Sequence, residues 1–255
     1  MRLHFQVKGE GSPIIIMHGF LGSLDNWRAA SKRFAERYKV YCLDLRNHGL
    51  SPHSDVMNYQ VMAQDLEEFL DLHRLASAFV LGHSMGGKVA MQFATAFPDR
   101  IDKLVVVDMA PRVYEPHHRP LLSALLSLDL ERFRSFGEAD GALAKTIPEV
   151  ATRQFVLKNL KRASDGRLQW KIHLQGIAQN YDAITRAVAP RAAFTKPACF
   201  IRGGRSNYIT EADIPLIRQI FPRAELQTIP SAGHWVHVDE PEEFFRCVTK
   251  FLSEP

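Results

Sequence analysis

Gly82-His83-Ser84-Met85-Gly86-Gly87 is the most informative segment of this 255-residue chain. It follows the apolar run Ala78-Phe79-Val80-Leu81, and apolar residues at helical spacing come after it. Strand, sharp turn and helix form the context in which a G-x-S-x-G motif holds a nucleophilic serine. Glycines flank such a serine because a Cβ there would collide with the neighbouring strand and helix. Ser84 is therefore the candidate nucleophile of an enzyme.

Short apolar runs alternate with helical patterns on both sides of this segment. Because a parallel sheet is covered on both faces, its strands are near-continuous apolar runs, as here. The sequence thus predicts an α/β fold, with a mostly parallel sheet flanked by helices. Further strands are predicted at residues 14–17, 40–43, 104–107, 198–201 and 225–229, and helices at residues 26–38, 59–72, 213–221 and 241–252 and directly after Ser84.

The alternation stops at Pro111, and the sheet pattern resumes near Ala198. The predicted organisation is a core domain of residues 1–111 and 192–255 with a helical cap, residues 112–191, inserted in it. Helices are expected in the cap at residues 121–130, 148–160 and 172–181, and a turn at Asp165-Gly166 separates the last two.

Composition excludes several classes of function. The net charge is +4, and thirteen Lys and Arg against eight Asp and Glu fall within residues 112–191. No tight basic run is interleaved with aromatic residues there, so nucleic acid binding is not expected. No run approaches the ~18 apolar residues of a membrane span. The three cysteines are far apart, so buried free thiols, a cytoplasmic location and no metal site are expected.

A serine hydroxyl needs a base to take its proton, and the base needs an orienting acid. The candidate base is His234, in the loop between the last predicted strand and the last helix. His237 is a weaker alternative because it lies closer to the helix. The oxyanion of an acyl-transfer reaction needs two aimed N–H groups, which we assign to Met85, after the nucleophile, and Phe20, in the loop after residues 14–17.

The usual loop for the acid, after residues 198–201, contains no carboxylate, and Ser206 stands where one is expected. The nearest carboxylates beyond it, Glu211 and Asp213, fall at a helix start, where acidic residues are common. One strand earlier, Asp108 closes an all-apolar run, which is costly for a carboxylate without a partner. Asp108 is the favoured acid, and Glu211 and Asp213 stay open as alternatives.

Together these motifs resemble the α/β-hydrolase superfamily over essentially the whole chain. The finer resemblance is to small bacterial YbfF-like esterases and their mitochondrial relatives. It is carried by the loop Arg46-Asn47-His48-Gly49-Leu50-Ser51, by residues 82–88, which form the turn around Ser84 (the nucleophile elbow), and by residues 203–208. The resemblance implies the triad Ser84, Asp108 and His234, with the acid on the strand that follows the nucleophile helix.

The expected reaction is hydrolysis of carboxylic esters or acyl thioesters of small to medium acyl groups, with no cofactor. A serine-dependent lyase or C–C bond hydrolase, or a non-catalytic binding relative, are the alternatives. His83, Trp235, Ser206 and Tyr208 are candidate pocket residues. Lys88 is expected to support packing or an ion pair. Apolar residues of the cap either line an acyl pocket or form the cap's own core.

Overall fold

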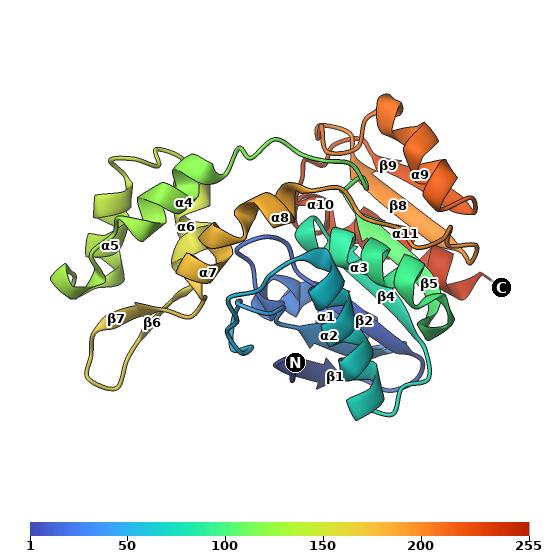
Figure 1. Ribbon diagram of the computed structural model, residues 1–255, viewed down its shortest axis with the longest axis horizontal. Helices are drawn as coiled ribbons and strands as arrows, with labels where there is room; N and C mark the ends of the chain where they lie inside the picture. Colours follow the sequence, from blue (N-terminus) through green and yellow to red (C-terminus); the bar gives the residue numbers. More distant parts are fainter. Residues whose placement is uncertain (255) are drawn as a thin grey trace.

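The computed structural model describes residues 1–254. Its centre is a seven-stranded sheet with the spatial order β1-β3-β2-β4-β5-β8-β9 (Figure 1). β1 runs antiparallel to β3, and the other neighbouring pairs are parallel, which confirms the predicted fold class. The strands of this sheet are β1 (Phe5–Lys8), β2 (Pro13–Met17), β3 (Lys39–Leu43), β4 (Ala78–His83), β5 (Ile101–Val107), β8 (Ala198–Gly203) and β9 (Ala224–Ile229).

Apolar cores cover both faces of the sheet. Successive side chains of a strand point to opposite faces, and in β2 Ile15 and Met17 join one core while Ile14 and Ile16 join the other. Helices α2 and α3 pack in the first core, and α1 and α11 in the second. The helices of this part are α1 (Arg28–Phe34), α2 (Tyr59–Leu72), α3 (Met85–Ala96), α9 (Ile214–Ile220), α10 (Val236–Asp239) and α11 (Pro241–Ser253), with 3₁₀ turns η1 (Leu24–Trp27), η2 (Pro98–Arg100) and η4 (Glu211–Asp213).

Between β5 and β8 the chain forms a group of short elements that lies to one side of the sheet (Figure 1). The prediction of helices alone is wrong here, because residues 160–162 and 168–170 pair as an antiparallel hairpin. The Asp165-Gly166 turn joins these two strands, and Gly166 takes the positive φ of 86° that suits glycine. These elements are α4 (Arg119–Leu126), η3 (Leu130–Arg132), α5 (Phe136–Leu143), α6 (Val150–Leu157), β6 (Leu160–Arg162), β7 (Leu168–Trp170), α7 (Leu174–Gln179) and α8 (Tyr181–Thr185).

The domain boundaries at residues 112 and 191 stay a prediction. The three cysteines are free, and Cys42 and Cys199 are buried. Among residues 1–254, no helix is both long and apolar enough to cross a membrane.

Candidate active site

Ser84 lies at the tight turn between β4 and α3. Its backbone has φ 53° and ψ −118°, a conformation that is strained for a residue with a Cβ. The turn is held in register because the Ser84 N–H donates to the Val107 carbonyl of β5 at 3.0 Å. The strain is the signature of a nucleophile elbow, which lifts the serine hydroxyl above the end of the sheet.

Steric clashes explain why the first and last positions of the motif, Gly82 and Gly86, are glycine. A Cβ at Gly82 would lie 2.1 Å from the Gly86 carbonyl oxygen. A Cβ at Gly86 would lie 2.6 Å from the His18 carbonyl oxygen and 2.7 Å from that of Met17, both main-chain atoms. Neither contact can be relieved by rotating a side chain, so the elbow requires glycine at both positions.

His234 reaches Ser84 from the loop between β9 and α10. Its Nε2 lies 3.0 Å from Ser84 Oγ. The ring is stacked against Tyr208, with centroids 3.8 Å apart and an interplanar angle of 18°. The main chain of His234 is fixed as well, because His83 Nε2–H donates to its carbonyl at 2.9 Å. The imidazole is therefore confined on one face and anchored at its backbone.

Asp108 is the carboxylate beside His234. It follows β5, has φ 49°, and its side chain is fully buried. Its Oδ2 lies 2.8 Å from His234 Nδ1 and accepts a bond of 2.5 Å from the Ser206 hydroxyl. Its Oδ1 accepts the Gly203 N–H at 3.1 Å. Three hydrogen-bond donors thus compensate the buried negative charge of Asp108 and hold its carboxylate beside the imidazole.

The other acid and base candidates are engaged elsewhere. Glu211 pairs with Arg202 at 2.6 Å, and Asp213 pairs with Arg112 at 2.7 Å. His237 is stacked on Trp27, with centroids 4.1 Å apart. The geometry therefore joins Ser84, His234 and Asp108 and leaves the alternatives apart from them.

Two buried histidines brace the loop that carries Phe20. His18 Nδ1–H donates to the Gly19 carbonyl at 2.8 Å, and its Nε2 accepts the Leu45 N–H at 3.0 Å. His48 Nε2 accepts the Leu21 N–H at 3.2 Å. Burial lowers the pKa of His18 to about 4 and that of His48 to about 3, so both rings stay neutral and can accept these bonds at neutral pH.

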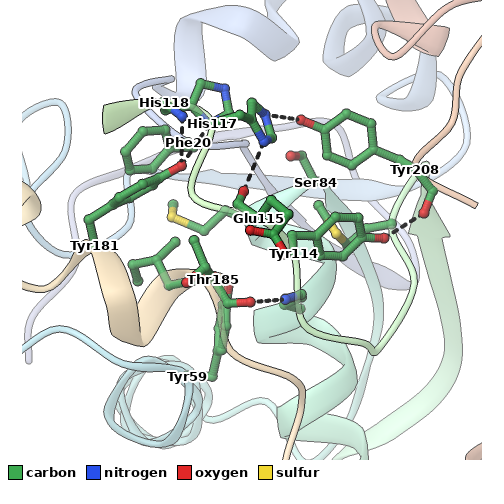
Figure 2. A pocket seen from close by; sticks show the side chains of 14 residues that line it. Phe20, Tyr59, Ser84, Tyr114, Glu115, His117, His118, Tyr181, Thr185 and Tyr208 are labelled. Carbon is green, nitrogen blue, oxygen red and sulfur yellow. Dashed lines mark hydrogen bonds between the residues drawn. The ribbon is translucent and has the colours of Figure 1, made fainter. Parts of the chain in front are cut away.

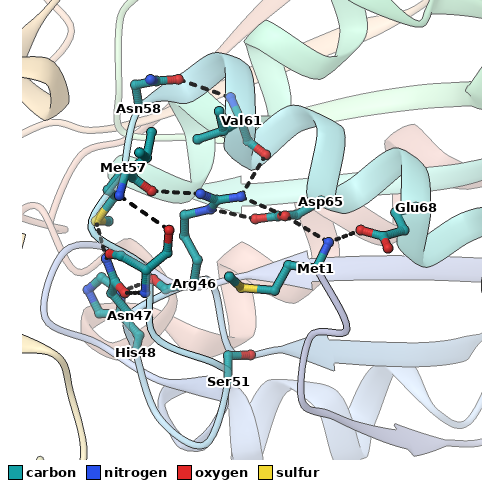
Figure 3. A network of polar contacts seen from close by, with 12 residues as sticks. Met1, Arg46, Asn47, His48, Ser51, Met57, Asn58, Val61, Asp65 and Glu68 are labelled. Atoms are coloured by element: carbon teal, nitrogen blue, oxygen red, sulfur yellow. Dashed lines mark hydrogen bonds and ion pairs between the residues drawn. The ribbon is translucent and has the colours of Figure 1, made fainter. Parts of the chain in front are cut away.

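The backbone that carries His48 is itself anchored, as Figure 3 shows. Arg46 forms a two-pronged ion pair with Asp65 of α2, with both N···O distances at 2.7 Å. Arg46 Nη1 also donates to the Val56 carbonyl at 2.6 Å. Planar, bidentate pairs of this kind fix geometry as well as charge. The ion pair therefore fixes the loop that contains Arg46 and His48, and through His48 this loop supports the loop that contains Phe20.

A narrow cavity of about 40 Å³ opens at Ser84 (Figure 2). Phe20 and Met85 are in its wall, beside the serine. Met85 is the first residue of α3, so its N–H has no carbonyl acceptor one turn earlier in the helix. The lining residues are Phe20, Tyr59, Ser84, Met85, Lys88, Met109, Tyr114, Glu115, His117, His118, Tyr181, Ile184, Thr185 and Tyr208.

The family model described as alpha/beta hydrolase fold matches residues 12–241. The chain belongs to the α/β hydrolase fold family. It is 37% identical to the mouse protein named sn-1-specific diacylglycerol lipase ABHD11, over 94% of this chain and 80% of that one. It is 34% identical to esterase YbfF of Escherichia coli, over 98% of this chain and 96% of that one.

Solved structures agree with these relatives. A marine microorganism esterase has 42% sequence identity and a TM-score of 0.95, and the match covers 98% of both chains. These three relatives are named as esterases or as a lipase, and this chain is an α/β hydrolase of the esterase and lipase type.

The hydrolase differs from the sequence-based picture in its pocket. Of the four predicted pocket residues, Tyr208 lines the cavity, whereas His83, Trp235 and Ser206 do not. His83 and Ser206 instead hold His234 and Asp108, and Trp235 packs edge-on against Phe155, with centroids 4.7 Å apart.

Most of the remaining wall was not predicted. It comes from α2, from the segment between β5 and α4, and from the end of α8 (Figure 2). Among the apolar residues between 112 and 191, Tyr181 reaches this cavity, whereas Leu122 and Leu125 are buried in the core. Lys88 of the elbow helix lines the cavity and makes no ion pair within residues 1–254; its hydrogen bonds go to carbonyls.

Proposed function

We propose that this α/β hydrolase cleaves carboxylic esters or acyl thioesters of small to medium acyl groups through an acyl-enzyme intermediate. The observation that carries the proposal is the unbroken hydrogen-bond chain from Ser84 through His234 to Asp108, with N···O distances of 3.0 and 2.8 Å. A nucleophile, a base within reach of its proton and a third group that orients the base form the arrangement that acyl transfer requires.

In the acylation half-reaction, Ser84 Oγ attacks the acyl carbon while His234 Nε2 takes the hydroxyl proton. Asp108 keeps the proton of the resting ring on Nδ1, so that Nε2 is free to accept, and it stabilises the imidazolium that forms. The N–H groups of Met85 and Phe20 are the proposed donors to the oxyanion. The imidazolium then protonates the departing alkoxide or thiolate.

In the deacylation half-reaction, a water molecule takes the place of the leaving group. His234 removes its proton while the oxygen attacks the acyl carbon of the Ser84 ester, and the imidazolium returns that proton to Ser84. One ester and one water give one carboxylic acid and one alcohol or thiol. The narrow cavity favours short acyl groups, and we place residues 112–191 as the cap that closes over them.

The test is hydrolysis of p-nitrophenyl esters from acetate to laurate, and of an acyl thioester followed with a thiol reagent. Ser84→Ala should reduce kcat/KM by at least about 10³-fold, because the nucleophile is lost. Ser123→Ala, an exposed serine on α4, is the matched control and should keep wild-type activity. A folded wild-type protein that turns over none of these substrates would overturn the proposal in favour of lyase or C–C hydrolase chemistry.

A further inference from the structure

Lys88 places a cation in the wall of the cavity that contains Ser84. The two residues are one helical turn apart, and the Lys88 N–H bonds to the Ser84 carbonyl at 3.2 Å. Ser84 directly precedes α3, and Lys88 lies in the first turn of that helix. Both line the cavity.

The surroundings of the Lys88 ammonium contain no carboxylate partner within residues 1–254. The residue is 1% exposed, yet in this part of the chain it takes part in no ion pair. Its Nζ donates to the main-chain carbonyls of Thr185, at 3.4 Å, and Arg186, at 2.5 Å; the bond to Thr185 is drawn in Figure 2. Nζ also lies 4.7 Å from the centroid of the Tyr114 ring and 5.4 Å from that of Tyr59.

A buried cation without a counter-ion is costly, and proteins rarely retain one without a use for it. Burial lowers the pKa of Lys88 to about 7, and the nearby Arg112 contributes to the same shift. The two carbonyls leave one of the three ammonium hydrogens without an acceptor among these bonds. An anion in the cavity would use that hydrogen and remove the electrostatic cost.

Lys88 and Ser84 line the same cavity, so an anionic group that binds Lys88 is expected on the acyl part of the substrate. The cavity wall beside Ser84 includes Met85, Met109 and Ile184, and among residues 1–254 Lys88 is the one lysine or arginine in that wall. Glu115, the one carboxylate that residues 1–254 give to the wall, is exposed, so water screens its charge. An acyl group on Ser84 that extends into this cavity of about 40 Å³ therefore shares it with the Lys88 ammonium.

We propose that Lys88 binds a second carboxylate on the acyl group, so that the enzyme prefers half-esters of short dicarboxylic acids to uncharged esters of equal length. The inference rests on the proposed ester hydrolysis and narrows its substrate class. A carboxylate that reaches Lys88 replaces water with a charge-assisted hydrogen bond in a buried setting, where such bonds are strong.

The experiment compares monomethyl glutarate with methyl pentanoate at pH 7, measured by release of methanol. The two acyl groups have the same number of carbons and differ in whether the far end is a carboxylate or a methyl group. The ratio of kcat/KM for the charged ester to that for the uncharged ester should be well above one in the wild type. Lys88→Met should lower the ratio by about 10- to 100-fold, as expected for a lost charged hydrogen bond. Lys88→Arg should keep the ratio above one.

Lys161→Met is the matched control, since Lys161 is an exposed cation on β6 and its loss should leave the ratio unchanged. Because the ratio is taken within one protein sample, partial misfolding of a variant affects both substrates alike. Equal loss of both activities in Lys88→Met would mean that Lys88 only ties α3 to the segment after α8, and would overturn the inference.

The wild-type protein also tests the inference without any variant. A ratio of one or below overturns it even if Lys88→Met does not fold. Hydrolysis of p-nitrophenyl butyrate but of neither methyl ester, or of methyl pentanoate with no preference for the charged ester, overturns this inference alone. Failure to hydrolyse p-nitrophenyl esters and the acyl thioester as well overturns the proposed function and this inference with it.

Discussion

Replacement of Asp108 by asparagine should almost abolish ester hydrolysis while leaving the fold intact. All three bonds to this carboxylate come from donors, namely the Gly203 N–H, the Ser206 hydroxyl and His234 Nδ1. An amide has one acceptor atom and one donor group. Whichever way the asparagine side chain turns, its NH₂ group faces at least one of these donors.

The Gly203 N–H cannot rotate, so the amide oxygen is expected to stay opposite it and the NH₂ group to face the imidazole. His234 then has to place its proton on Nε2 and present a bare Nδ1, which removes the acceptor that Ser84 needs. The loss expected for a wrong tautomer is about 10³- to 10⁴-fold in kcat, equivalent to about 4–5.5 kcal/mol.

The assay is hydrolysis of p-nitrophenyl butyrate by the wild type, Asp108→Asn, Asp213→Asn and Glu211→Gln, each checked by thermal unfolding. The last two are matched controls, since their carboxylates pair with Arg112 and Arg202 and should cost less than about tenfold. An Asp108→Asn protein with activity within tenfold of wild type would refute the assignment of the acid, and a large loss in either control would point to that residue in its place.

Three further predictions concern stability. Burial lowers the pKa of His237 from 6.5 to about 3, so between these pH values the unfolded chain binds a proton that the folded chain does not, and stability falls as the pH drops below 6.5. At pH 5 the loss from this residue is about 2 kcal/mol, and urea unfolding at pH 7.5 and 5.0 should show that His237→Phe avoids it; equal losses in both proteins would contradict the assignment. Gly141→Ala should raise stability by about 0.5–1 kcal/mol, because Gly141 is inside α5 and an added Cβ has no heavy atom within 4 Å, whereas Gly86→Ala should not fold. Thermal unfolding measures both, and a lower Tm for Gly141→Ala would contradict the reasoning.

The parts of the fold that could be predicted are those whose signals are local. The bounds of α2 agree with the predicted residues 59–72, because Asn58 caps its start by accepting the Val61 N–H and apolar residues follow at helical spacing. Ser84 and His234 stand in motifs that can be recognised along the chain. Asp108 could be selected because the loop after residues 198–201 has no carboxylate.

What the sequence did not predict depends on tertiary packing. α5 has two glycines in eight residues, which weakens any helical signal, and the strands of the β6–β7 hairpin are three residues each, too short to show alternation. The cavity wall draws Tyr59, Tyr114 and Ile184 from three separate segments. No local pattern marks such residues, because only the folded chain brings them to one place.

The ends of β5 and β8 are neighbours in the sheet, and Asp108, directly after the first, contacts His234. Asp108 follows the first strand and Ser206 follows the second, and both side chains share one hydrogen bond. The two positions are therefore adjacent, and a longer acidic side chain at 206 would start within one hydrogen bond of the carboxylate that His234 contacts. An ancestral protein with acids at both sites could lose either one and remain active at every generation. Whether the acid follows β5 or β8 would then depend on ancestry, and this position could distinguish lineages of hydrolases that catalyse the same reaction.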